Sequence, residues 1–272
     1  MYADDTKIIA SINPLTYSAD TALLQNDLDT FTTWTSTWLM ELNNSKCKLM
    51  HFGKNNRSHN YHLNDPLTQT KTSLDKSTSK RDLSIIISTN LKSSAQAQKA
   101  ASKANSMLGL MKRTFVSRNM RLWTKIYKTY IRPHLEFAIS AWNPSRQNDI
   151  NILEQVQRRS TKVPYCTRRL NYEDRCKKFK ITNLTDRRIR GDLIQQYKII
   201  NNLDEINWYS SPTLLPPRGN HRGFYIREVV RNCGERHNFF NNRIASSWNS
   251  LPDSVVQAES VNAFKSRLDK FL

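Results

Sequence analysis

The feature that most constrains the fold is a series of helix-periodic segments between residues 94 and 204. The alanine-rich stretch 94–115 repeats apolar residues at helical spacing, and further helices are expected over 121–131, 149–162 and 185–200. Such helices must bury their apolar faces against one another, so this region is expected to be mainly helical. The apolar face of the first helix contains Ala97, Ala101, Ala104, Leu108 and Met111.

Local signals predict where some helices begin and end. Pro133 lacks a backbone N–H and is expected to stop the helix over 121–131. Asn148 or Asp149 is expected to cap the next helix, and Ser260 the closing helix over 260–272.

Residues 1–93 mix helix and strand signals. Short β-compatible segments at 1–3 and 6–10 predict a hairpin, and an amphipathic helix over 18–42 follows it. Strands are expected at 47–53 and 83–88, and the polar segment between them predicts a loop with a short hairpin. The helix has Ser18 as its expected N-cap and an apolar face of Leu24, Leu28, Phe31, Trp38 and Leu42, with Trp38 expected in the core.

Past residue 205 the pattern weakens. A linker rich in Pro and Gly over 211–223 precedes a strand over 224–231 and two closing helices. The predicted fold class is therefore α+β. The predicted regions are 1–93, 94–204 and 205–272.

Charge is concentrated in the helical part. Residues 1–100 carry 11 Lys and Arg against 9 Asp and Glu, whereas the remaining 172 residues carry 31 against 14, a net charge of +17. A surplus this large indicates a polyanionic partner, and the alternative is a set of solvated basic faces.

The cysteines and the apolar runs indicate the compartment in which the protein is expected. The four cysteines lie at spacings that match no zinc motif and are expected to be free thiols in a reducing compartment. Neither an apolar run long enough to span a bilayer nor a leader peptide is visible, so a soluble intracellular protein without membrane contact is expected.

The paired acids Asp4 and Asp5 stand at the tip of the first expected hairpin. Two carboxylates on a rigid, exposed turn can supply oxygen ligands to Mg²⁺, as phosphoryl-transfer polymerases require. An Asp-Asp pair alone is common, however, and an incidental acidic turn is the alternative.

An ordered series of blocks favours the metal site. The segments "YADDTKI", "TWLMELNNSKCKLMHFG", "RDLSIIISTNLKSS", "IYKTYIRPHLEFAISAWNPS", "LEQVQRRSTK" and "NFFNNRIASSWNSLPDSVVQAESVNAFKSRLD" follow one another. In this order they resemble the reverse transcriptases of non-LTR (LINE-type), jockey-like retrotransposons, over essentially the whole chain. The resemblance implies a polymerase palm remnant, followed by a mainly helical thumb and a C-terminal region.

The resemblance also implies roles for particular residues. Asp4 and Asp5 would bind Mg²⁺, or Mn²⁺ in its place, with Asp4 as the primary ligand, and Tyr2 and Ala3 would flank the primer terminus. Lys46 would protonate or pair with pyrophosphate, and its alternative is a solvated lysine. The partners would be an RNA template, an RNA–DNA or DNA primer duplex and deoxynucleoside triphosphates, in the nucleus and cytoplasm.

Two departures from the family pattern matter. Ser84 stands where the family has a glycine, in a turn or close approach. The family's other metal-binding aspartate and its fingers would lie before Met1, so the chain matches a reading frame that starts inside the catalytic hairpin. The chain alone is therefore expected to extend no primer, and Asp82 is the first acid to test should it do so.

Clustered basic residues are expected to hold phosphates without reading base sequence. A solvated basic face is the alternative. The aromatic residues interleaved with these charges could stack on bases, but most are expected in the core: Trp123, Tyr127, Tyr130, Trp142 and Trp248. The expected contacts are Arg158, Arg159, Lys162, Arg168, Arg169, Arg187, Arg188 and Arg190.

Three functions remain open from the sequence. The first is a fragment of an RNA-directed DNA polymerase. The second is a non-catalytic basic module that binds RNA or an RNA–DNA duplex, and the third is a non-functional remnant of a retroelement. The sequence leaves the oligomeric state open.

Overall fold

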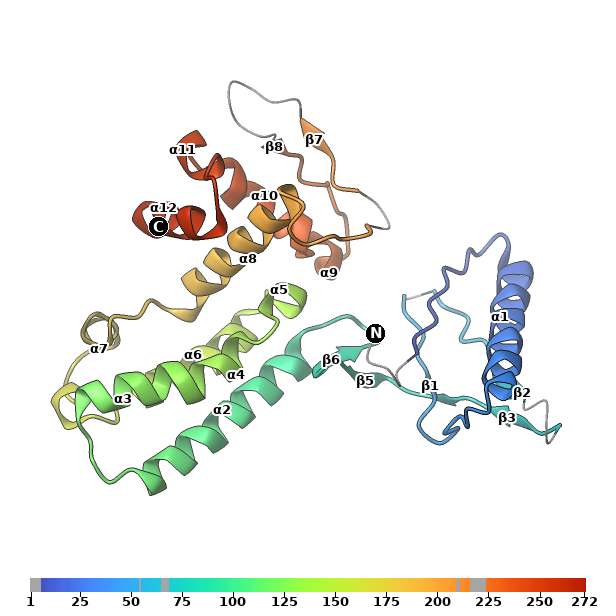
Figure 1. Ribbon diagram of the computed structural model, residues 1–272, viewed down its shortest axis with the longest axis horizontal. Helices are drawn as coiled ribbons and strands as arrows, with labels where there is room; N and C mark the ends of the chain where they lie inside the picture. Colours follow the sequence, from blue (N-terminus) through green and yellow to red (C-terminus); the bar gives the residue numbers. More distant parts are fainter. Residues whose placement is uncertain (1–5, 54, 65–68, 209–210, 216–223) are drawn as a thin grey trace. The chain divides into compact units, whose positions relative to one another are not determined.

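The structure is a computed structural model that describes residues 6–53, 55–64, 69–208, 211–215 and 224–272 (Figure 1). The chain divides into two compact units. Unit 1 contains residues 1–80 and 88–90, and unit 2 contains residues 81–87 and 91–272. Helices and small two-stranded sheets build the described residues, which confirms the predicted α+β class.

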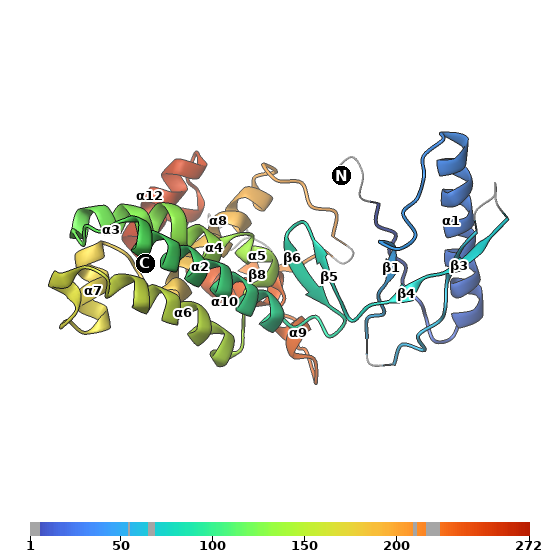
Figure 2. The ribbon, with the colours of Figure 1, turned by 90° about the horizontal axis from the view of Figure 1, so that it is seen from below.

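Unit 1 combines one long helix with short strands. Helix α1 (Tyr17–Thr37) lies beside strand β2 (His62–Asn64), as Figure 1 shows, and Figure 2 shows β3 on the same side of the helix. Strand β2 pairs antiparallel with β3 (Lys71–Ser73). Strand β1 (Lys48–Leu49) pairs parallel with β4 (Asp75–Lys76), so only two residues of the expected strand 47–53 are in a ladder.

Helix α1 contacts strand β2 through polar side chains. The Gln25 amide accepts from His62 N at 3.1 Å and donates to His62 O at 2.9 Å. Asp29 Oδ1 accepts from Asn64 Nδ2 at 2.6 Å. The helix side chains therefore satisfy backbone groups that a strand edge would otherwise leave to water.

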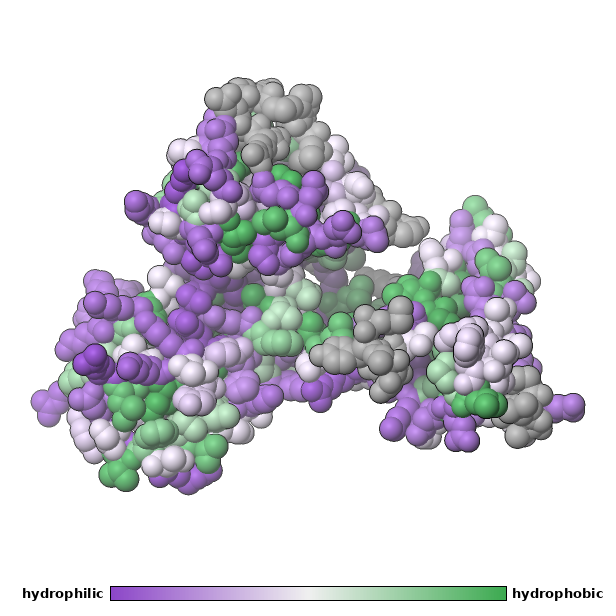
Figure 3. Space-filling model, viewed as in Figure 1, coloured by the Kyte–Doolittle hydropathy of each residue, from purple (hydrophilic) through white to green (hydrophobic). Residues whose placement is uncertain are grey.

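Two predictions for this helix were wrong. It begins at Tyr17, so Ser18 lies inside it and Thr16 is the N-cap. It also ends at Thr37, so Trp38 and Leu42 lie beyond it. Leu24, Leu28 and Phe31 of the expected apolar face are half-buried, whereas Trp38, expected in the core, is 66% exposed. Figure 3 shows hydrophobic side chains on the visible face of this unit. The buried residues of α1 are Thr21, Thr32 and Thr35.

Strands β5 (Ser79–Asp82) and β6 (Ile85–Ser88) form a hairpin with a two-residue turn. Both turn residues have left-handed backbones, with φ of 43° at Leu83 and 72° at Ser84. A turn with two positive φ angles matches the twist of a hairpin and favours glycine. The position that departs from the family pattern is thus one where a side chain carries a conformational cost.

Ser84→Gly is expected to stabilise this hairpin by about 0.5–1 kcal/mol, because glycine adopts a positive φ without the steric penalty of a Cβ. The lost hydrogen bond from Arg81 Nη2 to Ser84 Oγ, 3.0 Å long, is exposed and subtracts little. Hydrogen exchange of the strand amides measures the change. The matched control Ser79→Gly, inside strand β5, should instead weaken protection, and equal effects of the two variants would contradict the strain at Ser84.

Unit 2 is mainly helical. Helix α2 (Ser94–Thr114) packs on α6 (Gln147–Thr161) and on α4 (Arg132–Glu136). The helical prediction over 94–115 is confirmed, and its predicted apolar face is buried. The remaining helices of this first cluster are α3 (Met120–Ile126), α5 (Ile139–Trp142) and α7 (Tyr172–Phe179).

Pro133 does not stop its helix. Helix α3 continues through a π-helical turn, η1 (Tyr127–Ile131), directly into α4. Arg132 N donates to Tyr127 O, five residues back, so the ladder is already rearranged where Pro133 offers no donor. Arg146, not Asn148 or Asp149, occupies the N-cap position of α6 and makes no side-chain capping bond. The Asp149 carboxylate accepts from Ser94 Oγ at 2.6 Å instead.

A second cluster of buried side chains joins α8 (Leu184–Ile200) to α10 (Phe240–Asn249), α11 (Asp253–Val256) and α12 (Val261–Phe271). The short helix α9 (Gly234–His237) precedes α10 and buries no side chain. Ser260 caps α12 as predicted, since its Oγ accepts from Ala263 N at 3.2 Å. Of the strand predicted over 224–231, only β8 (Phe224–Tyr225) forms, paired with β7 (Leu214–Leu215).

Candidate nucleic-acid interface

The predicted catalytic residues are described only in part. Asp4, Asp5, Tyr2 and Ala3 lie outside the described residues. Lys46 lies in the turn after α1, where its side chain is exposed and its carbonyl accepts from Lys80 Nζ at 3.0 Å. The structure therefore places the lysine on the surface and leaves its predicted role untested.

The described residues do not fit a two-metal site. No group of three or more His, Cys, Asp or Glu that could hold a metal ion occurs among them. Asp75 is bonded to Lys48 Nζ at 2.7 Å, and this hydrogen bond lowers the pKa of Asp75. Asp29 is bonded to α1 and β2 side chains, and Asp82 is half-buried at the end of β5. Among the described residues, these carboxylates therefore belong to no group of three or more candidate metal ligands.

A basic surface runs from the end of α6 to the end of α7. We call it the 158–178 basic surface, and all of its Lys and Arg side chains except Arg175 are exposed. Within the same stretch the acids are Glu173 and Asp174. The exposed cations are Arg158, Arg159, Lys162, Arg168, Arg169, Lys177 and Lys178. Seven cations against two carboxylates leave a strong positive potential over a short segment.

Buried hydrogen bonds fix the backbone beneath this surface. Arg175 is 3% exposed, and it donates to Thr161 Oγ1 at 3.1 Å and to Leu170 O at 2.6 Å. Thr167, in the short helix η2 (Tyr165–Thr167), donates to Thr161 O at 2.8 Å. The loop between α6 and α7 is thereby tied to the helix before it, which holds the surface cations in one arrangement.

A second network lies deeper, between α6, α7 and α8. Gln157 is fully buried and donates to Tyr172 Oη at 2.6 Å and to Thr182 O at 3.0 Å. Glu154 accepts from Leu184 N at 3.0 Å, at the start of α8, and from Tyr172 Oη. Burial, and then the Glu154 carboxylate, raise the pKa of Tyr172, so its hydroxyl stays a donor. Sequence reasoning missed this network and α7, because polar core residues break the apolar pattern.

Two aromatic rings accompany the surface cations. The Arg158 guanidinium lies 4.4 Å from the Tyr172 ring centroid, and that of Arg168 lies 4.3 Å from the Tyr165 centroid. Tyr165 is 67% exposed, so one face of an aromatic ring is offered to solvent beside the cations. Of the aromatics predicted in the core, Tyr130 is 50% exposed, whereas Trp123, Tyr127, Trp142 and Trp248 are buried as expected.

The structure does not bring the three α8 arginines together with this surface. Arg187 donates to both carboxylate oxygens of Glu136, and Arg190 donates to both of Asp269. Arg188 is 2% exposed, and its Nε and Nη2 have no hydrogen-bond partner among the described residues. Burial lowers the pKa of Arg188. The three arginines are therefore not free cations on one surface, because Arg187 and Arg190 are each paired with a carboxylate and Arg188 is inside the protein.

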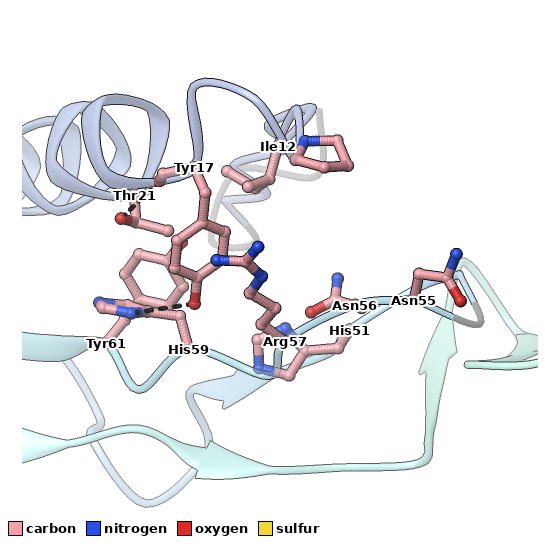
Figure 4. A pocket seen from close by; sticks show the side chains of 10 residues that line it. Ile12, Tyr17, Thr21, His51, Asn55, Asn56, Arg57, His59 and Tyr61 are labelled. Atoms are coloured by element: carbon pink, nitrogen blue, oxygen red, sulfur yellow. Dashed lines mark hydrogen bonds between the residues drawn. The ribbon is translucent and has the colours of Figure 1, made fainter.

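Unit 1 holds a small cavity of about 50 Å³ lined by histidine, tyrosine and Arg57 (Figure 4). Tyr17 Oη lies 3.4 Å from His59 Nδ1, and the Arg57 guanidinium lies 4.7 Å from the Tyr17 ring centroid. His51 Nε2 is buried without a hydrogen-bond partner among the described residues, and burial lowers the pKa of His51. The cavity has room for a water molecule. Sequence reasoning missed it because 54–80 was interpreted as a loop.

Comparison with protein-family models, with curated proteins and with solved structures gives no match to this chain. Across the part of the chain that the structure describes, no helix is both long and apolar enough to cross a bilayer.

Proposed function

We propose that unit 2 binds RNA or an RNA–DNA duplex by its phosphate backbone, without reading the base sequence. The observation that carries this proposal is the 158–178 basic surface. It contains seven exposed cations and only two acids, and buried hydrogen bonds hold the backbone beneath it. Arginine and lysine contacts to phosphate supply most of such affinity and position the duplex. The exposed Tyr165 ring adds a stacking face beside them.

The wider proposal places this surface in the thumb of a non-LTR retrotransposon reverse transcriptase, with residues 1–93 as a palm remnant. The ordered sequence blocks support it, and so does the φ of 72° at Ser84, where the family pattern has glycine. Template-directed DNA synthesis from deoxynucleoside triphosphates with Mg²⁺ or Mn²⁺, in the nucleus and cytoplasm, belongs to this proposal by resemblance. No catalytic step is assigned to the described residues, because none of their side-chain groups fits a metal site.

The test is binding of the 272-residue chain to a fluorescent 20-base-pair RNA–DNA hybrid at several salt concentrations. With five phosphates contacted, the expected slope of log K against log salt is about −4.5, so affinity falls roughly 500-fold between 50 and 200 mM salt. Hybrids of unrelated sequence should bind within about threefold of one another, because backbone contacts carry no base information. A slope shallower than −1, or strong dependence on base sequence, would contradict the proposal.

A further inference from the structure

A second group of cations surrounds a single carboxylate, Glu136, where η1, α4 and α8 meet. Lys128 lies on η1, Arg132 begins α4, and Arg187 lies on α8. Arg187 uses both oxygens of Glu136, whereas Arg132 Nε lies 3.7 Å from Glu136 Oε2, beyond hydrogen-bond distance. The Glu136 carboxylate thus lies near two guanidinium groups but is hydrogen-bonded only to that of Arg187.

Arg132 is left with unmet donors. Its side chain is 19% exposed, yet among the described residues its guanidinium donates no hydrogen bond. A guanidinium that is mostly buried normally makes several, since it carries five N–H groups in a planar fork. Burial, followed by the charge of Arg187, lowers the pKa of Arg132. An acceptor with several oxygens is the partner that this group lacks.

Lys128 lies near Arg132, and it too has more N–H donors than protein acceptors. Its Nζ donates to Lys180 O at 3.2 Å, which leaves two of its three N–H groups without a protein acceptor among the described residues. Burial, and then the charges of Arg132, Arg187 and Lys180, lower the pKa of Lys128. Four cations therefore share this place with Glu136.

The geometry points to a binding site for one phosphate group, held by the Arg132 guanidinium and the Lys128 ammonium. Arg187 and Lys180 add attraction around it, and a phosphate supplies the oxygens that the fork of Arg132 lacks. The frame is rigid: Arg132 N is bonded to Tyr127 O, and Tyr127 Oη donates to the buried Gln157. This inference does not depend on the proposed function, because the site shares no residue with the 158–178 basic surface.

Calorimetric titration of the full chain tests the site, with inorganic phosphate in one arm and the RNA–DNA hybrid in the other. Arg132→Gln and Lys128→Gln are each expected to weaken phosphate binding at least tenfold. The matched control is Arg121→Gln, an exposed cation on α3, which should change it less than twofold. Circular dichroism verifies the fold of each variant, and Lys128→Gln is decisive should Arg132→Gln unfold.

The two arms separate the sources of the phosphate. Weakened binding of inorganic phosphate supports a site for free phosphate groups. Weakened hybrid binding without measurable binding of inorganic phosphate supports a site for a backbone phosphate. Binding that is unchanged by both variants in both arms overturns the inference. If the chain binds inorganic phosphate and both variants weaken that binding, but the chain does not bind the hybrid, the proposed function is contradicted and the phosphate site is supported.

Discussion

Replacing Arg158, Arg159, Lys162, Arg168 and Arg169 together by glutamine is expected to weaken hybrid binding about 100-fold or more at 150 mM salt. Each cation that contacts a phosphate contributes about one to the slope of log K against log salt, so the slope should become shallower by about four to five. All five side chains are exposed, and the interactions that they lose are two cation–π contacts and a 3.3 Å hydrogen bond from Arg159 to Asn105. The fold should therefore survive.

The matched control removes the same charge from the same unit. The control replaces five exposed cations of α2 and α3 by glutamine: Lys103, Lys112, Arg113, Arg121 and Lys125. Its net charge equals that of the test variant, so a diffuse electrostatic attraction would weaken binding equally in both. A localised interface predicts a slope change of less than about one for the control. An equal loss of hybrid affinity in the two variants would contradict the assignment of the 158–178 basic surface as the interface.

The helices of unit 2 could be predicted because their apolar periodicity agrees with what they bury. Ala97, Ala104 and Leu108 are each at most 3% exposed, as the spacing indicates. Ser260 could be predicted as a cap because capping is a local interaction within one turn. The α1 stripe could not be judged in the same way, because periodicity does not reveal whether a partner exists to cover it.

The roles of the arginines could be predicted only in part. Arg158 and Arg159 are exposed because they extend from the outer side of α6. Arg187 and Arg190 have the same chemistry, but their partners, Glu136 and Asp269, are 51 and 79 residues away in the sequence. Composition cannot distinguish an exposed arginine that is free to bind phosphate from one that is paired with a carboxylate of the same chain. Long-range contacts decide the difference, and the carboxylates that make them carry no local signal.

One buried carboxylate joins elements of both clusters of unit 2. Asp192 on α8 is 5% exposed, and it accepts from Arg243 on α10 through Nε at 2.8 Å and Nη2 at 2.9 Å. Asn143 Nδ2, after α5, donates to it at 3.0 Å, and Arg243 also donates to Ser140 O at 2.6 Å. A single side chain therefore links α5, α8 and α10.

Asp192→Ala is expected to destabilise unit 2 by about 3 kcal/mol, since it leaves the largely buried guanidinium of Arg243 without its carboxylate. This loss of stability is at the lower end of what removing one partner of a buried ion pair costs. The reason is that a cavity of about 110 Å³ beside the pair admits water to the guanidinium. For a unit of this size the midpoint of thermal unfolding should fall by roughly 6–12 °C. Calorimetry measures the midpoint. Tryptophan fluorescence should change mainly when unit 2 unfolds, because Trp123 and Trp248 are fully buried, whereas Trp34 and Trp38 of unit 1 are 50% and 66% exposed.

Two further variants separate an unpaired charge from a general loss of packing. Glu228→Ala breaks the surface pair with Arg236, whose side chains are 49% and 62% exposed, and should cost less than about 1 kcal/mol. Replacing the buried pair as Asp192→Leu with Arg243→Met removes both charges together and should restore most of the stability lost in Asp192→Ala. A double variant as unstable as the single one would show that the lost hydrogen bond from Asn143 to Asp192, rather than the unpaired guanidinium, accounts for the loss. In that case the link between the clusters is a hydrogen-bond network in which charge plays little part, and neutral side chains of the same shape could replace it.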